Sequence, residues 1–138
     1  MVTLPNYEIK RVLGSGSFGK LYLIKNSGYV FEAFDHTNNR VVALKRIEKV
    51  GSSLSREYEI LFDVKNCDHV VKILDFYYSK NDQNKLIQNI VFEYMEDNLE
   101  NMIQQRLKKQ LYFSQVEIKF FIYQVLKGLE YIHSKSTV

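Results

Sequence analysis

The sequence has little that would place the protein outside a reducing compartment or in a membrane. It contains a single cysteine, Cys67, so no disulfide can form within the chain, and we expect an intracellular protein of the cytoplasm or nucleus. No apolar run is long enough to span a bilayer, and the first residues lack the apolar stretch of a signal peptide. The net charge is only +3 and the basic residues are dispersed, which argues against nucleic acid or a membrane as partner.

What the sequence does contain is enough apolar surface for a core. Hydrophobic residues make up 46% of the 138 positions, which suits one small domain or part of one, and no segment is of low complexity. A metal site is not expected, because Cys67-Asp68-His69 has no further ligands clustered nearby and is typical of a turn.

The most informative stretch begins with a glycine-rich loop and ends with a lysine. Gly14, Gly16 and Gly19 form a G-x-G-x-x-G pattern. Because glycine has no Cβ, the backbone N–H groups of such a loop can approach phosphate oxygens. The stretch closes on an apolar run that ends in Lys45, a mobile point charge suited to the same anion. The combination predicts a phosphate site with a cation at its far wall.

The residues after the loop decide which kind of phosphate site to expect. A dinucleotide-binding fold would start a helix at the loop. Residues 20–24 and 29–34 are instead aromatic and β-branched, which is typical of strands. The alternative is another kind of nucleotide-binding α/β protein. Residues that start a helix after Gly19 would favour this alternative, and the sequence has none there.

Hydrophobic periodicity predicts an α+β fold, with an antiparallel sheet of about five strands that carries one helix. Strands are expected at residues 7–13, 20–24, 29–34, 41–45, 70–78 and 86–92, of which 20–24 belongs to an extra hairpin. Helices are expected at residues 54–64 and 114–134, with a short helix or loop over 96–107.

The helix over residues 54–64 carries an acidic residue on its apolar face. At helical pitch Glu57 lies on that face, whereas Glu59 points into solvent. An acid on an apolar face needs a cationic partner, and Lys45 is the candidate. The alternative is that Glu57 pairs with Arg56 or with a surface lysine.

The last helix has the clearest signal. Ser114 and Glu117 form a capping box, in which each side chain bonds the backbone of the other residue. An apolar stripe follows, widened by aromatic residues until most of the circumference is apolar, so the helix belongs inside a domain. The stripe consists of Ile118, Phe121, Ile122, Val125, Leu129 and Ile132. Left uncovered, residues 114–134 would promote self-association or chaperone binding.

Together these motifs resemble the amino-terminal half of a eukaryotic protein kinase, over nearly every residue from Tyr7 to Val138. Segments 91–99 and 121–134 are similar to the group of MAP kinases, cyclin-dependent kinases and glycogen synthase kinases. The motifs are the glycine loop at 14–19, Val-Ala-Leu-Lys at 42–45, Arg-Glu at 56–57, Ile-Val-Phe-Glu-Tyr-Met at 90–95, and Tyr-Gln through His-Ser at 123–134.

The resemblance implies a kinase amino-terminal lobe over residues 1–95, ending in a hinge, and the first helices of an incomplete carboxy-terminal lobe over 96–138. It implies ATP with Mg²⁺ as cofactors and a protein as the phosphoryl acceptor. Lys45 would hold the α- and β-phosphates, anchored by Glu57. The other implied contacts are Gly14, Gly16 and Gly19 at the phosphates, Leu13, Val30 and Ala43 around the adenine, Phe92 as gatekeeper, Glu93 and Met95 at the hinge, and Asn98 at the ribose.

The sequence departs from the family pattern in two places. Residues 20–28 look inserted, because Val30 rather than Leu21 has the family's spacing from Lys45. One interpretation is a harmless extra hairpin. The other is a disrupted nucleotide loop or an unremoved intron. The 138 residues also stop before a His-Arg-Asp catalytic loop, so they lack the catalytic base and the Mg²⁺ ligands and should be inactive as such. The chain is then a fragment of a serine/threonine kinase or, alternatively, a non-catalytic regulatory or binding module derived from one.

Overall fold

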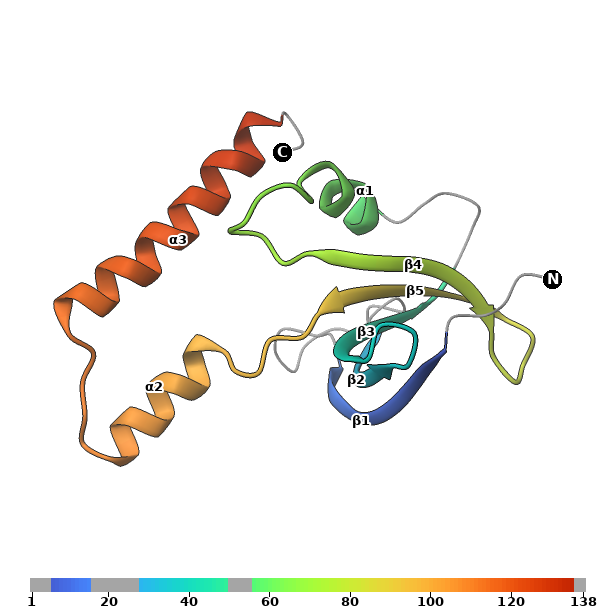
Figure 1. Cartoon of the computed structure of the whole chain (residues 1–138), viewed down its shortest axis with the longest axis horizontal. Helices are drawn as coiled ribbons and strands as arrows, with labels where there is room; N and C mark the ends of the chain where they lie inside the picture. Colours follow the sequence, from blue (N-terminus) through green and yellow to red (C-terminus); the bar gives the residue numbers. More distant parts are fainter. Residues whose placement is uncertain (1–5, 16–27, 50–55, 136–138) are drawn as a thin grey trace, which may run out of the picture.

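The computed structural model of the chain describes residues 6–15, 28–49 and 56–135, and over these ranges it shows five strands and three helices (Figure 1). The strands are β1 (Tyr7–Ser15), β2 (Tyr29–Asp35), β3 (Arg40–Glu48), β4 (Ile73–Lys80) and β5 (Leu86–Glu93). The helices are α1 (Arg56–Asp63), α2 (Leu99–Lys108) and α3 (Gln115–Ser134).

The strands form one antiparallel sheet in the order β1-β2-β3-β5-β4, which confirms the predicted α+β fold. The fourth strand was misplaced by the sequence interpretation: it begins at Ile73 rather than at residue 70 and continues to Lys80. The hairpin loop starts later because Asn81 closes it, its side-chain oxygen accepting bonds from the backbone N–H groups of Gln83 and Lys85. The strand expected at residues 20–24 lies outside the described residues.

One face of the sheet holds the main apolar core. Its fully buried residues are Ala33, Val42, Leu44 and Val91. Tyr7 and Tyr77, from the two edge strands, close over this core with their rings stacked at 5.8 Å between centroids. The Tyr7 hydroxyl also donates to Asp75 Oδ2 at 3.0 Å, so the side chains of β1 and β4 meet although the strands are not paired.

Helix α1 packs beside β4 on the opposite face of the sheet (Figure 1). The Tyr58 ring of α1 stacks on Phe76 of β4 at 3.9 Å, and Val64, directly after the helix, is buried. These contacts place Glu59 in solvent, as its helical phase predicts. Of the expected residues 54–64, the structure describes the helix from Arg56 to Asp63.

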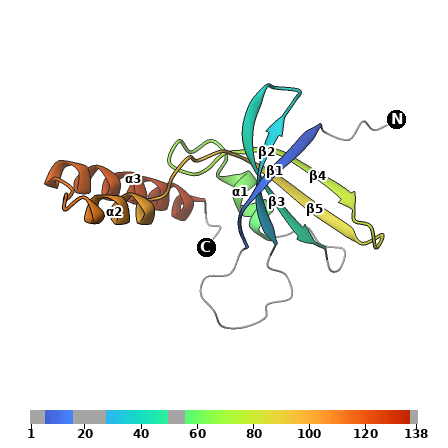
Figure 2. The same cartoon turned by 90° about the horizontal axis from the view of Figure 1, so that it is seen from below.

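Helices α2 and α3 lie away from the sheet in both views (Figure 1, Figure 2). The predicted capping box of α3 is present, with Ser114 accepting from the Glu117 N–H and Glu117 accepting from the Ser114 N–H. Arg106 of α2 also binds Glu117, at 2.6 Å, and these bonds from Arg106 and Ser114 lower the pKa of Glu117 to about 2. None of the helices in the described ranges is both long and apolar enough to cross a membrane.

Helix α3 approaches the sheet domain at one glycine. Gly128 is its one fully buried residue, and a Cβ added there would lie only 2.9 Å from the backbone oxygen of His69. His69 also meets the Tyr123 ring edge-on at 6.3 Å. The absence of a side chain at Gly128 therefore lets α3 contact the loop between α1 and β4.

We expect Gly128→Ala to loosen this contact. Alanine is a better helix former than glycine by about 1 kcal/mol, so α3 itself should remain folded, but the added methyl must push the helix away from His69. Hydrogen exchange should accelerate severalfold at residues 66–70, while Lys119→Ala on the exposed part of α3 leaves it unchanged. Equal exchange in both variants would show that the glycine is not required.

Candidate functional site

The strand register brings several predicted site residues onto one face of the sheet, opposite the core. Directly opposed residues in an antiparallel pair share a face. Val30 is opposite Lys45, and Ala43 is opposite Phe92. Ala43 and Lys45 are two residues apart on β3, so their side chains also share a face. The four positions therefore form one patch, with the apolar residues beside the lysine.

Glu57 of α1 reaches this patch and binds its lysine. Lys45 Nζ lies 2.7 Å from both carboxylate oxygens of Glu57, which confirms the predicted partner. Only 23% of the Lys45 side chain is exposed, against 40% for Glu57. The ammonium is thus held at a fixed point beside the apolar patch, with part of its surface open to solvent.

The glycine loop is described only at its beginning. Gly14 lies in β1 opposite Val30, and Leu13 occupies a bulge between Val12 and Gly14 with 39% of its surface exposed. Gly16 and Gly19 lie outside the described residues, as do positions 20–27, so both interpretations of the inserted segment stay open.

The segment after β5 is anchored by backbone and side-chain bonds of Glu93. Its N–H donates to the Lys72 carbonyl at 3.1 Å, and its Oε1 accepts from the Lys72 N–H at 2.9 Å. Two residues after Glu93, and three after the patch residue Phe92, Met95 is 58% exposed. Glu93, the first residue of the predicted hinge, is therefore fixed to the backbone of Lys72.

Asn98 has a role that the sequence interpretation missed. It is the N-cap of α2, and its Oδ1 accepts a hydrogen bond from the Asn101 N–H at 2.9 Å. The signal was present, because asparagine ahead of a helix is a preferred N-cap residue. One acceptor site of this side chain is therefore used within the chain, at a residue predicted to contact the ribose.

A polar cluster was also missed. Arg11 of β1 binds Glu32 of β2 at 2.7 Å, and the Tyr94 hydroxyl donates to the same Glu32 oxygen at 3.2 Å. Arg11 also donates to the Tyr94 hydroxyl at 3.2 Å. No local sequence pattern reveals this cluster, because it depends on the register of β1 and β2 and on the path of the chain after β5.

The patch suits a ligand with a flat apolar ring and a negatively charged chain. Val30, Ala43 and Phe92 are partly exposed and offer a shallow apolar surface, and Lys45 offers a held cation beside it. A purine nucleotide combines these two chemistries. In the described part of the chain no three histidine, cysteine, aspartate or glutamate side chains gather.

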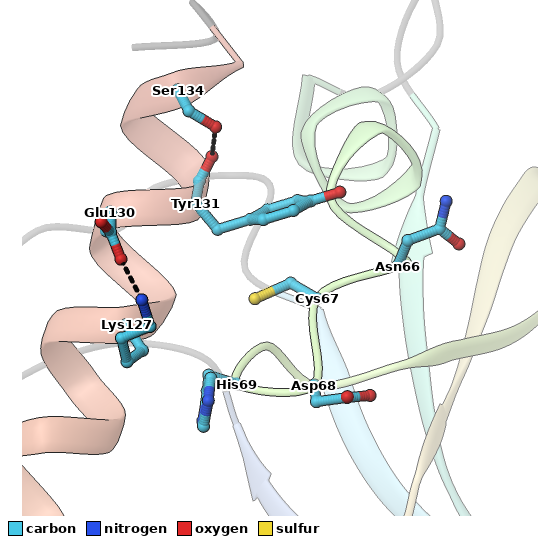
Figure 3. Close-up of a pocket in the computed structure, with 8 residues that line it drawn as sticks. All are labelled: Asn66, Cys67, Asp68, His69, Lys127, Glu130, Tyr131 and Ser134. Atoms are coloured by element: carbon cyan, nitrogen blue, oxygen red, sulfur yellow. Dashed lines mark hydrogen bonds and ion pairs between the residues drawn. The ribbon is translucent and has the colours of Figure 1, made fainter.

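A separate hollow of about 420 Å³ lies where α3 meets the loop at residues 66–69 (Figure 3). The Cys67 side chain points toward the space between loop and helix, and the paired Lys127 and Glu130 lie on the helix side. The Tyr131 ring extends toward the loop. None of the predicted nucleotide contacts that the structure describes lines this hollow, which lies at the junction between α3 and the loop that follows α1.

Comparison with known proteins agrees with this geometry. The family model described as "Protein kinase domain" matches residues 7–138. A probable serine/threonine-protein kinase, glkA, of Dictyostelium discoideum is 36% identical over 132 residues, covering 94% of this chain and 24% of the relative. Cyclin-dependent kinase D-1 of Arabidopsis thaliana is 35% identical over 135 residues, covering 94% of this chain and 29% of the relative.

A third relative is less similar in sequence, but the chain covers a larger share of its length. Cyclin-dependent kinase B2-1 of Oryza sativa subsp. japonica is 28% identical over 138 residues, covering 96% of this chain and 40% of its own length. The chain thus spans between 24% and 40% of these three relatives. With the family model matched over almost all of its residues, the chain belongs to the protein kinase family.

Proposed function

We propose that these residues are the ATP-binding lobe of a serine/threonine protein kinase, and that the whole protein transfers the ATP γ-phosphoryl group to serine or threonine in a protein substrate. The observation that carries the proposal is the Lys45–Glu57 ion pair, 2.7 Å long, on the face that also carries Val30, Ala43 and Phe92. The names of the relatives, which are serine/threonine and cyclin-dependent kinases, support the reaction class.

Each part of the patch has a role in this proposal. Lys45 contacts the α- and β-phosphates, and Glu57 holds the ammonium in place for them. Leu13, Val30 and Ala43 pack on the adenine. Phe92 borders it, and the backbone of Glu93 and Met95 meets its polar edge, while Gly14, Gly16 and Gly19 cover the phosphates. When bound, ATP supplies the transferable phosphoryl group and Mg²⁺ neutralises its charge.

The proposal is tested by titrating ATP into the 138-residue chain. We expect binding that is weaker than low micromolar, because in the family the second adenine wall and the metal ligands come from residues that are not among these 138. Each ~1.4 kcal/mol of lost contact weakens the dissociation constant tenfold. Calorimetry or NMR with ATP, adenosine and tripolyphosphate checks this. A low-micromolar constant would contradict the expected weakness, and no binding at millimolar ATP would overturn the proposed function.

A second candidate function is a non-catalytic binding module. The exposed apolar surface of α3 favours it, since Val116, Phe120 and Val125 are 76%, 59% and 61% exposed. A second copy of the chain is the simplest partner for this surface. In such a module Lys45→Ala would leave association unchanged, which separates this function from nucleotide binding.

The proposed location is the cytoplasm or the nucleus. The location rests on the single cysteine, Cys67, which is buried and free.

A further inference from the structure

The cluster of Arg11, Glu32 and Tyr94 links three separated segments. Glu32 is at its centre: its side chain is only 20% exposed, and its Oε2 accepts from both Arg11, at 2.7 Å, and Tyr94, at 3.2 Å. The hydrogen bond that Arg11 donates to Glu32 raises the pKa of Arg11, so this guanidinium stays charged. Arg11 is on the first strand, Glu32 on the second, and Tyr94 follows the last strand.

The strand register places this cluster in line with the candidate adenine contacts. Arg11 is opposite Glu32, Glu32 is opposite Ala43, and Ala43 is opposite Phe92. Directly opposed residues share a face, so all four lie in one row across the sheet. Tyr94 comes two residues after Phe92 and reaches back along this row to Glu32.

Consecutive residues therefore connect the predicted hinge to opposite edges of the sheet. Glu93 bonds the backbone of Lys72, directly before the edge strand β4. Tyr94 bonds Glu32 of β2 and Arg11 of the other edge strand, β1. A single exposed ion pair is worth little, but a third partner from a distant segment fixes the spacing between that segment and the pair.

We propose that Tyr94 is a positioning residue, which sets the distance between the hinge and the β1–β2 ribbon and thereby the width of the space that receives the adenine ring. This inference rests on the proposed function, since the space matters only if the patch binds a nucleotide. Tyr94 acts through Glu32 and Arg11 and does not itself touch the nucleotide.

The test compares Tyr94→Phe with a matched control, Tyr112→Phe. Tyr112 is 81% exposed in the connection between α2 and α3. Tyr94→Phe removes both hydrogen bonds of the hydroxyl, to Glu32 and from Arg11. It should weaken the binding of adenosine and of ATP equally, by at least threefold to tenfold, about the range for one lost hydrogen bond. It should also speed hydrogen exchange in the free protein at both residues 8–13 and residues 93–97. Tyr112→Phe should change neither quantity.

A charge exchange supplies a second test. Arg11→Glu alone places two carboxylates side by side and should weaken adenosine at least as much as Tyr94→Phe. Arg11→Glu combined with Glu32→Arg restores the ion pair and returns a donor to the Tyr94 hydroxyl, so affinity should recover to within twofold of the wild type.

The outcomes separate the two claims. If the wild type binds ATP and Tyr94→Phe matches Tyr112→Phe in affinity and exchange, the positioning role is wrong and the proposed function stands. If Tyr94→Phe weakens tripolyphosphate as much as adenosine, the effect is not on the adenine space and the inference also falls. If the wild type binds none of the three ligands, the proposed function itself has failed.

Discussion

Replacing Lys45 with alanine is expected to weaken ATP binding at least tenfold while leaving adenosine binding unchanged. The ammonium is held by Glu57 beside the apolar patch, where it can meet phosphate oxygens. A hydrogen bond to a charged partner contributes about 1.5–3 kcal/mol, or roughly a tenfold to hundredfold difference in affinity. Parallel titrations of ATP and adenosine measure the two effects.

Two further variants control this experiment. Lys119→Ala removes an exposed lysine from α3 and should not change either affinity. Glu57→Gln keeps the size of the side chain but removes its charge, so the lysine is held less firmly. The affinity for ATP should therefore fall, but by less than in Lys45→Ala. An equal loss for adenosine and ATP in Lys45→Ala would point to disturbed folding, and no loss for ATP would exclude Lys45 from the site.

The 138-residue chain, expressed by itself, is expected to self-associate through α3. Val125 and Leu126 each lie about one helical turn after Ile122, and the exposed fractions of Ile122, Val125 and Leu126 are 54%, 61% and 58%. Burying such side chains is worth about 1.5–3 kcal/mol each, and a contiguous patch of them is typical of a surface that another polypeptide covers. Size-exclusion chromatography with light scattering should show oligomers, and glutamine at the three positions should yield monomers.

A change on the sheet serves as the control for this prediction. Ile9 and Val12 on the edge strand β1 are 42% and 56% exposed, and threonine at both positions preserves the tendency to form a strand. These substitutions should leave the oligomers intact. If the β1 variant is monomeric and the α3 variant still forms oligomers, the association occurs at the sheet. A monomeric wild type would refute the predicted self-association altogether.

The parts of the fold that depend on local periodicity could be predicted. The phase of α1 predicted that Glu57 rather than Glu59 faces the sheet, which made Lys45 its candidate partner, and the structure confirms this pair. The capping box at Ser114 was equally local, because both partners lie within four residues. Whether the patch binds ATP, with the residue roles implied by the family resemblance, stays a prediction.

The parts that depend on register or on tertiary contacts could not be predicted. The end of β4 at Lys80 could not be placed from the sequence, because nearly all of the strand is half-buried and its residues show no alternation that marks the end. The bonds of Tyr94 to Glu32 and Arg11 span 62 and 83 positions, beyond any local pattern. Gly128 gave no signal either, since its role comes from the nearby His69 carbonyl.

The stacking of Tyr7 on Tyr77 affects whether a strand of another protein can add to an edge of the sheet. An open edge strand offers unpaired backbone groups to which a foreign strand can add. Here the two edge strands meet through an aromatic pair and the Tyr7–Asp75 hydrogen bond, so a strand adding near this contact would have to displace it. Burial and the Asp75 carboxylate raise the pKa of Tyr7, so its hydroxyl remains a donor even in alkaline solution. The contact between the two edge strands should therefore persist from neutral into alkaline solution.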